Sequence, residues 1–289
     1  MAIFPSTNID ANLGELAMTP LRLEILGEAI RYAKLRLLKM HFDSDASYIG
    51  SGLSCLDILM TLFHIVIDER DRFVLSKGHA AGALYTTLNS IGRVSDEEIS
   101  SLRLDAGAPL RGDDVVISHG GPGHGLPLAN GLALARSIRR ESGRVYCVLS
   151  DGECQQGSTW EALMFASHQN LAVTAIVDAN GLQGLGSTAE IAGMSDLLLR
   201  LRSMGIEPHL CDGHSPQSIV DACAFPMGFR LVVAKTLKGN GVSYMENRVE
   251  WHHLTMNESQ YTQAVNEVVA SGLVEARSGM PYFEFREAA

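Results

Sequence analysis

The chain has 289 residues, of which 46% are hydrophobic and 19% charged, so wholesale disorder is excluded. Acidic residues outnumber basic ones by 33 to 23, and the net charge of −10 argues against a general nucleic-acid binder. We expect no membrane span, because no apolar run approaches the roughly 18 residues that one needs. Five scattered cysteines without a Cys-x-x-Cys pair, and an N-terminus without a secretory signal, are typical of a cytoplasmic protein with reduced thiols.

Helical and strand signals alternate along the chain. Signals for helix starts are Thr19-Pro20, Ser54, Ser95 with Glu98, Ser158 with Glu161, Ser215-Pro216 and Asn257. With the apolar periodicity they predict helices over residues 20–40, 56–67, 80–91, 125–140, 158–168, 195–203, from 216 onward, and 257–270. Short apolar runs predict strands over residues 72–75, 144–149, 172–177, 207–210 and 229–234. The alternation indicates an α/β fold with a doubly wound, mainly parallel sheet.

Polar residues follow the expected strands, where ligands bind in sheets of this kind. Asp151 ends one strand and Asn180 follows the next, so a carboxylate and an amide oxygen would meet at one edge of the sheet. Both are oxygen ligands suited to Mg²⁺. Gly152 would let backbone N–H groups approach a phosphate closely. The alternative is that Asp151 and Asn180 are ordinary turn-forming residues after strands.

Three further stretches have chemistry-bearing side chains. His79 stands at a predicted helix start after a strand, the glycine-rich run Gly120–Gly125 opens another helix, and Trp251-His252-His253 follows the last strand. Glycine-rich turns at helix N-termini suit anions. Taken singly, each stretch is more typical of a surface or internally bonded histidine, or of a solvated loop, than of a binding site.

Together these stretches resemble the thiamine-diphosphate-dependent transketolases, specifically the N-terminal half that forms a separate chain in split transketolases. The resembling segments keep the family's order and spacing from about residue 20 to residue 270: Gly50–Ser54, Phe73–Ala80, Gly123–Leu126, Asp151–Gly157, Trp160–Ala162, Asp178–Gln183, Asp212–His214, Ala234–Val242 and Glu250–His253. The resemblance implies a thiamine-diphosphate-binding fold of the diphosphate-binding type. This domain would cover residues 19–289, after an N-terminal arm over residues 1–18.

The resemblance also implies a site. Mg²⁺ would be bound by Asp151, Asn180 and the backbone carbonyl of Leu182, and would hold the cofactor diphosphate. The residues implied to bind thiamine diphosphate are His79, Gly120, Pro122, Gly152, Glu153, Asn180 and His252. The catalytic residues would be His79, His252 and His119. The implied reaction transfers a two-carbon ketol unit from a sugar or sugar-phosphate donor, with the cofactor as electron sink and the protein supplying orientation and acid–base groups.

Several positions depart from the family pattern. Tyr48 and Asp113 stand where the family has two substrate-contacting histidines, and Gln156 replaces a glutamate. The loop after Asp113 is shorter, and His119 within it is expected either to replace a missing histidine or to face solvent. We therefore expect a substrate other than the ordinary sugar phosphates. The acceptor could be an aldose phosphate or a carrier-bound group.

The family's cofactor-activating glutamate lies in a second domain, and nothing after Gly272 is long enough to form it. We therefore expect a partner, the C-terminal-half transketolase subunit, in an α₂β₂ assembly. One rival interpretation is the α-subunit of a 2-oxo acid dehydrogenase E1 component, against which Ser76–Ala80 and Trp251–His253 argue. The other is a non-catalytic subunit that keeps the fold, against which the Asp151–Asn180 pair argues.

Overall fold

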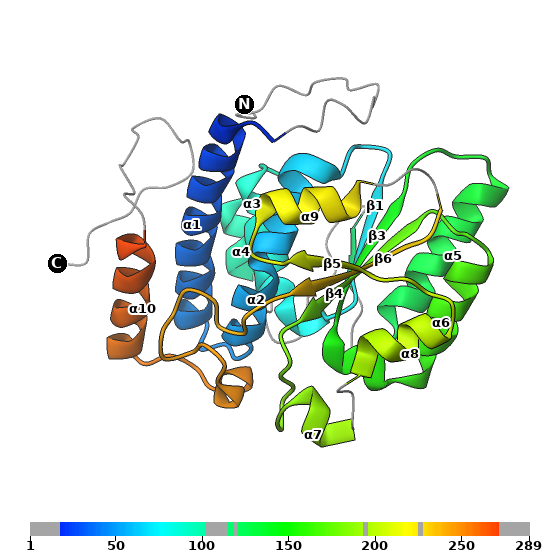
Figure 1. The fold of residues 1–289 in the computed structure, drawn as a ribbon. Coiled ribbons are helices and arrows are strands. Elements are labelled where there is room, and N and C mark those ends of the chain that lie inside the picture. Colours follow the sequence, from blue (N-terminus) through cyan, green and yellow to red (C-terminus); the bar gives the residue numbers. More distant parts are fainter. Residues whose placement is uncertain (1–17, 102–114, 118–120, 193–195, 225–227, 272–289) are drawn as a thin grey trace.

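The protein's structure, a computed structural model, describes residues 18–101, 115–117, 121–192, 196–224 and 228–271. In these residues six parallel strands form one sheet in the order β2-β1-β3-β4-β6-β5 (Figure 1). The strands are β1 (Arg72–Leu75), β2 (Val115–Ile117), β3 (Val145–Ser150), β4 (Val173–Ala179), β5 (His209–Asp212) and β6 (Arg230–Lys235). The chain passes from β1 to β2 on one side and reaches β3 on the other side of β1. Such a reversal leaves a crevice at the carboxyl ends of the strands.

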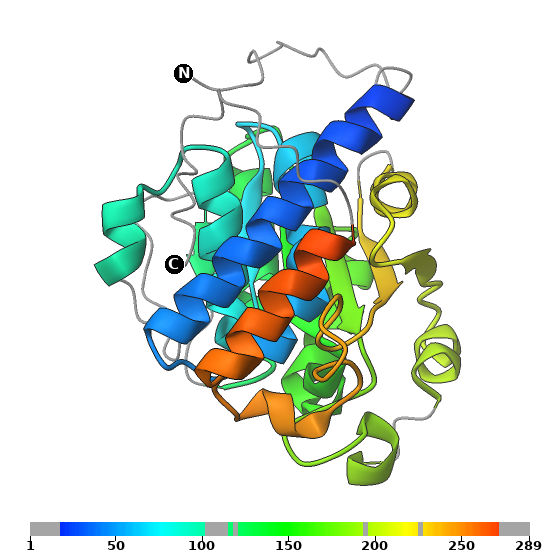
Figure 2. The same ribbon diagram turned by 90° about the vertical axis from the view of Figure 1, so that its left-hand side faces the viewer.

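Helices cover both faces of the sheet (Figure 1). One layer contains α1 (Pro20–Asp43), α2 (Ile49–Thr61), α3 (Ala81–Ser90), α9 (Pro216–Cys223) and α10 (Glu258–Ala270), with α1 and α10 side by side in Figure 2. The other contains α5 (Gly125–Ile138), α6 (Gly157–His168) and α8 (Leu197–Ser203). Two short helices are α4 (Asp96–Ser101) and α7 (Thr188–Ala192). Each layer packs its own hydrophobic core against the sheet.

Helix α2 lies at the centre of the first layer. All its residues are buried, and it continues into a π-helical turn over Leu62–Val66. The whole stretch Ile49–Val66 is long and apolar enough to cross a membrane, which corrects the sequence-based expectation, but 78% of it is buried inside the protein. Glycine permits this burial: a Cβ atom on Gly50 would lie 3.0 Å from the backbone oxygen of Trp251, in the 3₁₀ turn Val249–His252. The stretch is therefore packed as a core helix.

The helices and strands that the sequence predicts occur in the structure in the predicted order. Of the predicted helix caps, some are confirmed and two are wrong. Thr19, Ser95, Ser215 and Asn257 accept hydrogen bonds from the first turns of α1, α4, α9 and α10, as predicted. The predicted caps Ser54 and Ser158 are wrong. Ser54 lies inside α2, and the Ser158 hydroxyl donates to the Gly123 carbonyl at 2.8 Å. The short strand β2 was not predicted.

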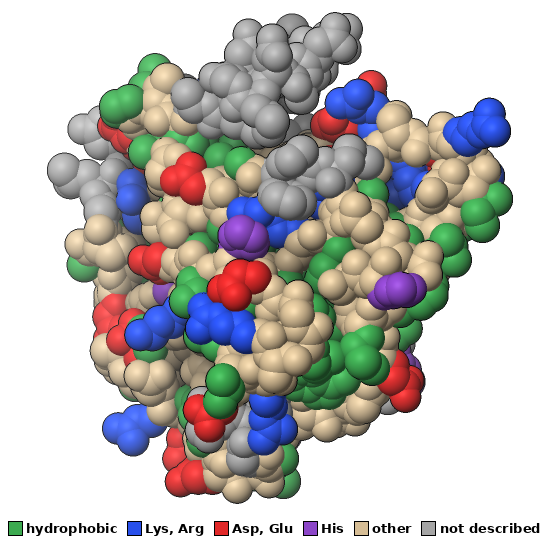
Figure 3. All heavy atoms as spheres, turned by 45° about the vertical axis from the view of Figure 1, so that its right-hand side comes forward, with side chains coloured by type: hydrophobic (Ala, Val, Ile, Leu, Met, Phe, Trp, Pro, Cys, Tyr) green, Lys and Arg blue, Asp and Glu red, His purple; other side chains and the backbone are tan. Residues whose placement is uncertain are grey.

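On the face drawn in Figure 3, positive and negative charges are not separated into patches. Figure 3 shows acidic and basic side chains interspersed there among apolar and uncharged polar groups. All five cysteines are buried free thiols.

Candidate active site

A cleft of about 620 Å³ opens at the carboxyl ends of β1, β3 and β4. The segments that follow these three strands provide most of its walls, with additions from the start of α2, the turn before α5 and the segment after β6. Its lining residues are Tyr48, Ser51, Ser76–His79, Gly121, Pro122, Ser150–Glu153, Gln156, Asn180, Leu182–Gly184, Lys238 and His252. Residues from distant parts of the sequence therefore meet at the edge that the strand pattern predicted.

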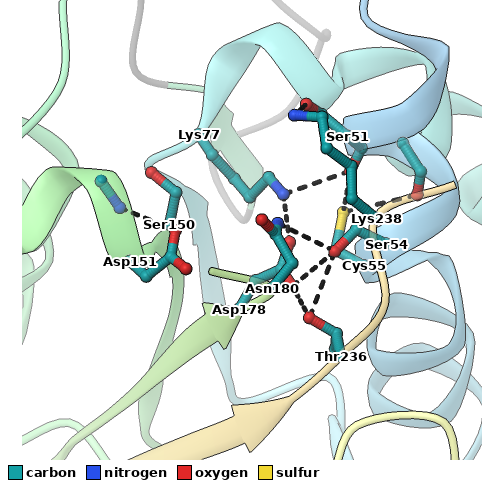
Figure 4. A network of polar contacts seen from close by, with 12 residues as sticks. Ser51, Ser54, Cys55, Lys77, Ser150, Asp151, Asp178, Asn180, Thr236 and Lys238 are labelled. Carbon is teal, nitrogen blue, oxygen red and sulfur yellow. Dashed lines mark hydrogen bonds and ion pairs between the residues drawn. The ribbon is translucent and has the colours of Figure 1, made fainter. Parts of the chain in front are cut away.

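Asp151 contributes a buried carboxylate to this cleft. The pairing of β3 with β4 sets Ser150 opposite Asp178, so the next residues of both strands emerge at the same edge (Figure 4). The carboxylate of Asp151 accepts the Gly152 N–H at 2.8 Å on one oxygen and the Gly181 N–H at 2.6 Å on the other. Burial, and next the negative charge of Asp178, raise the pKa of Asp151 to about 7. A bound cation would relieve this penalty.

Asn180 and Leu182 line the cleft with Asp151. The side-chain amide of Asn180 donates to the Ser54 hydroxyl at 3.1 Å, and its oxygen accepts the Leu182 N–H at 2.9 Å. These bonds fix the amide oxygen, which keeps a second lone pair. Among the described residues, no cluster of three or more His, Cys, Asp or Glu side chains is arranged to hold a metal. A mixed carboxylate, amide and carbonyl set instead matches the oxygen preference of Mg²⁺.

Two buried lysines lie beside the acidic residues, and neither was predicted as a site residue. Lys77 forms an ion pair with Asp178 beneath the cleft and donates to the Ser51 carbonyl at 3.2 Å (Figure 4). Burial would by itself raise the pKa of Asp178, but Lys77, Thr236 and Ser54 together hold it below its usual value. Burial would by itself lower the pKa of Lys77, but the negative charge of Asp178 outweighs that effect, so this pKa lies above its usual value. Lys77 is therefore a fixed, neutralised cation.

Lys238 differs from Lys77 in its partners. Its ammonium contacts the Ser51 hydroxyl at 3.2 Å and Nδ1 of His252 at 3.0 Å. In the described part of the chain it has no carboxylate within ion-pair distance, although only 1% of the residue is exposed. Burial, and next the positive charge of Lys77, lower the pKa of Lys238 to about 8. A buried, uncompensated cation at the wall of a cleft favours an anion in that cleft.

The predicted histidines His79 and His252 lie together, with ring centroids 5.4 Å apart. Tyr48 packs against both, at 5.6 Å from His79 and edge-on at 5.1 Å from His252. Burial, followed by the nearby lysines, lowers the pKa of His252 to about 3; burial and then Lys77 bring that of His79 well below its usual value. Both rings are therefore neutral at pH 7. Because an ammonium only donates, Nδ1 of His252 accepts from Lys238, and Nε2 has the proton.

The remaining predicted residues fall into three groups. Pro122 and Gly152 line the cleft. Glu153 also lines it, but its carboxylate is bonded within the protein: one oxygen accepts from Ser76 and the Gly123 N–H, the other from the N–H and hydroxyl of Ser150. Glu153 thus connects the ends of β1 and β3 to the turn before α5. Its predicted contact with a cofactor stays a prediction. His119, Gly120 and Asp113 lie outside the described residues.

Sequence signals existed for the residues that were missed. Ser150, which was not predicted, forms a capping box with the predicted Glu153, and the spacing of three residues is the one that such boxes require. Lys77 lies two residues before the predicted His79, and Lys238 lies three residues after Lys235, which ends β6 and is exposed. Burial, which separates Lys238 from Lys235, is not visible in the local sequence.

Comparison with known proteins agrees with this geometry. Residues 65–268 match the family described as "Transketolase, thiamine diphosphate binding domain". The chain is 32% identical to an apulose-4-phosphate transketolase subunit of Phocaeicola vulgatus, over 81% of this chain and 90% of that one. It is 31% identical to a 6-deoxy-6-sulfo-D-fructose transketolase subunit of a Clostridium species, over 78% of this chain and 89% of that one.

Full-length transketolases match over less than half their length. The human enzyme is 34% identical over 86% of this chain, which covers 42% of the human chain. The fold superposes on transketolase from Campylobacter jejuni with a TM-score of 0.76 at 24% identity, covering 85% of this chain and 43% of that one. These matches favour the transketolase interpretation over the 2-oxo acid dehydrogenase one. The chain belongs to the transketolase family, as a transketolase-type transferase subunit built on the family's thiamine-diphosphate-binding domain.

Proposed function

We propose that this chain is the diphosphate-binding subunit of a two-subunit transketolase that uses thiamine diphosphate with Mg²⁺. The observation that carries the proposal is the pairing of two uncompensated charges in one cleft. Lys238 is a buried cation without a carboxylate partner among the described residues, and Asp151 is a buried carboxylate with a raised pKa. A metal–diphosphate complex would satisfy both at once, because Asp151 would bind the metal and Lys238 would compensate the negative charge of the phosphates.

The same residues suggest how the group would be held. Asp151, Asn180 and the Leu182 carbonyl would bind Mg²⁺, while Lys238, His79, His252 and the Gly152 backbone would hold the diphosphate. Thiamine diphosphate, when bound, supplies the electron sink that ketol transfer needs. The chain's own contribution is orientation and proton transfer. Neutral His79 can donate or accept one proton at the substrate hydroxyl groups, while His252, whose Nδ1 accepts from Lys238, can donate the proton on Nε2.

Two subunits are needed in this proposal. The named relatives of similar length are subunits, and the full-length relatives are more than twice as long as the part this chain covers. The partner would provide the cofactor-activating glutamate, with the cofactor bound across an α₂β₂ interface. The purified chain should then show no turnover until the second subunit is added. Steady turnover by this chain alone would overturn this part of the proposal.

The substrate would differ from the common pentose and hexose phosphates. Tyr48 stands in the cleft beside His79 and His252, where a family histidine is expected, and a phenol is a poor base at neutral pH. Two relatives have names that specify apulose 4-phosphate and 6-deoxy-6-sulfo-D-fructose, which are less common sugars. A modified ketose is therefore the proposed donor class. A carrier-bound acceptor is the second acceptor class to test, beside aldose phosphates.

Calorimetry with thiamine diphosphate and Mg²⁺, with the partner subunit present, tests the cofactor assignment. Asp151→Ala or Asn180→Ala removes one metal ligand, and binding should fall below detection. Glu207→Ala is the matched control, because it deletes an exposed carboxylate whose ion pair with Arg202 lies at the surface. Unchanged affinity in both site variants would refute the metal assignment. A wild-type chain that binds no cofactor would support the non-catalytic interpretation instead.

A further inference from the structure

His214 connects α2 with the segment that follows β6, outside the wall of the cleft. Its Nδ1 lies 2.5 Å from a carboxylate oxygen of Asp57 in α2. The backbone N–H of Leu237 donates to its Nε2 at 2.8 Å. The Asn240 amide donates to the same oxygen of Asp57 at 2.9 Å. One imidazole therefore links a core helix to the peptide directly before Lys238.

The contacts of Nδ1 with Asp57 and of Nε2 with the Leu237 N–H define which nitrogen of the ring is protonated. A backbone N–H can only donate, so Nε2 of His214 must accept and has no proton. The proton is then on Nδ1, where it donates to Asp57. This neutral tautomer satisfies the Leu237 N–H and Asp57, whereas a doubly protonated ring would face the Leu237 N–H with another donor. The Asn240 amide nitrogen also lies 2.9 Å from Nδ1, and because both groups are donors, it directs its hydrogen to Asp57 instead. Asp57 is 3% exposed, and Lys34 lies 3.7 Å from its other oxygen. The carboxylate is thus held in place from more than one element.

The segment that His214 holds has no regular secondary structure, so it depends on such contacts. The Lys238 carbonyl accepts from the Asn247 N–H at 3.1 Å, and the Gly239 N–H donates to the Gly50 carbonyl at 3.0 Å. His214 supplies the contact at the preceding residue, Leu237. From there the Lys238 side chain runs inward to Ser51 and His252.

We propose that His214 is a positioning residue that, with Asp57, holds the Leu237 peptide in place. The Lys238 ammonium then stays beside Ser51 and His252 in the wall of the cleft, where an anion would bind. The proposal rests on the proposed function in one respect, namely that Lys238 meets the cofactor diphosphate. Its structural half, the bond from the Leu237 N–H, can be measured without any cofactor.

Two substitutions separate the two nitrogens of the ring. In His214→Asn the amide nitrogen takes the place of Nδ1 and still donates to Asp57, but nothing reaches the Leu237 N–H. In His214→Gln the longer side chain returns an oxygen to the position of Nε2. Both keep a polar group beside Asp57, so neither leaves that carboxylate without a donor. A merely structural role would make the two variants alike.

The first measurement is hydrogen exchange of the Leu237 amide in the full chain without cofactor. His214→Asn should speed exchange at Leu237 by about tenfold or more, since its hydrogen bond is lost, and His214→Gln should leave it near the wild-type rate. Lys238→Met should not change it. Equal exchange in the Asn variant and the wild type would overturn the proposal, whatever the cofactor does.

The second measurement is the affinity of the complex with its partner for thiamine diphosphate and Mg²⁺, by calorimetry. His214→Asn should weaken binding about tenfold, and Lys238→Met at least as much. If His214 acts through Lys238, the double variant should bind no more weakly than Lys238→Met alone. Losses that multiply in the double variant would show that His214 acts independently and would refute the positioning role. Absence of binding by the wild type would instead refute the proposed function and leave the exchange result to decide on His214.

Discussion

The ammonium of Lys77 and the carboxylate of Asp178 form an ion pair in which the two side chains are 1% and 0% exposed. Lys77 comes from the end of β1 and Asp178 from the end of β4, so the pair bridges two strands that are not neighbours in the sheet. Ser54 adds a bond from α2 to Asp178 at 2.7 Å. The floor of the cleft is thus tied to the helix layer by charge and hydrogen bonds as well as by packing.

Lys77→Met should be strongly destabilising, because it leaves the Asp178 carboxylate buried beside hydroxyl groups alone. Removing one partner of a buried pair lowers the free energy of unfolding by about 3–5 kcal/mol. Urea denaturation at pH 7 measures this change. Lys39→Met is the control, since the Lys39–Asp43 pair is 60% and 52% exposed, and its loss should change stability by under about 1 kcal/mol.

The pH dependence of this effect has a defined sign. The folded-state pKa of Asp178 lies below its ordinary value of 3.8, so the pair stabilises the fold above that pH. The contribution is lost as the pH falls through the lower, folded-state value. The difference between the wild type and Lys77→Met should therefore shrink in strong acid. A difference that stayed constant from neutral pH into acid would contradict the ion-pair assignment.

Asp151→Asn should stabilise the chain without cofactor while weakening cofactor binding. The folded pKa of Asp151 is about 7 against an ordinary 3.8, so the folded state binds the extra proton between these values. Stability of the wild type therefore falls as the pH rises from 4 to 7 on account of this group, and the loss is complete above pH 7. Asn has no charge to bury.

Thermal unfolding of the cofactor-free chain at pH 5 and pH 8 checks this sign. The advantage of Asp151→Asn over the wild type should be larger at pH 8 than at pH 5. Asp221→Asn, on the exposed side of α9, should show no such dependence. Added thiamine diphosphate and Mg²⁺ should reverse the order at pH 8, because only the wild type keeps the carboxylate ligand. A variant that is less stable at both pH values would count against the buried charge.

Two glycines of α5 should respond in opposite ways to alanine. A Cβ atom on Gly125 would lie 2.3 Å from Cβ and 2.5 Å from Cα of Ser76, whereas one on Gly131 meets nothing within 4 Å. Gly125→Ala should cost about 1–3 kcal/mol or more through overpacking and should disturb Ser76 at the cleft. Gly131→Ala should add about 0.5–1 kcal/mol, since alanine is the better helix former. Denaturant titration of both variants gives the comparison.

Local patterns predicted the sheet but misplaced parts of the helix layer. The strand runs that lead to Asp151 and Asn180 were clear because both strands are buried on two faces, which produces continuous apolar segments. The start of α2 was missed because Gly50 and Gly52 are typical of a turn. In the fold they are helical and allow close approach of Trp251 and Leu37. Only tertiary packing distinguishes these two uses of glycine.

The oxygen-ligand residues of the site were predicted better from the sequence than its lysines. Asp151 and Asn180 each follow a predicted strand, Leu182 was implied by the family resemblance, and all three line one cleft. Lys238 has no comparable local signal, because its burial depends on the contact with Ser51 from α2 and His252 from a later turn. The positions His119 and Gly120 lie outside the described residues, so their predicted roles stay predictions.

Tyr48 supports the sharpest substrate prediction. Its backbone is left-handed, at φ 68° and ψ 12°, and its ring contacts those of His79, His252 and His253. Histidine is among the residues that adopt this conformation more readily, so Tyr48→His should not strain the start of α2. The imidazole would restore a group able to exchange protons near neutral pH. We expect Tyr48→His to raise kcat/KM for xylulose 5-phosphate with ribose 5-phosphate by about tenfold or more in the reconstituted enzyme.

Tyr48→Phe separates the hydroxyl group from the shape of the ring. It keeps the aromatic packing against His252 but cannot donate, so it should show no gain on the pentose phosphates and should lose activity on the natural donor if the phenol contacts it. Activity on apulose 4-phosphate and on 6-deoxy-6-sulfo-D-fructose should be compared in all three forms. Efficient turnover of the pentose phosphates by the wild type, at a kcat/KM of about 10⁴ M⁻¹s⁻¹ or above, would show that Tyr48 does not restrict the substrate. In that case the chain would serve an ordinary transketolase reaction, and the tyrosine would be a tolerated replacement at the mouth of the cleft.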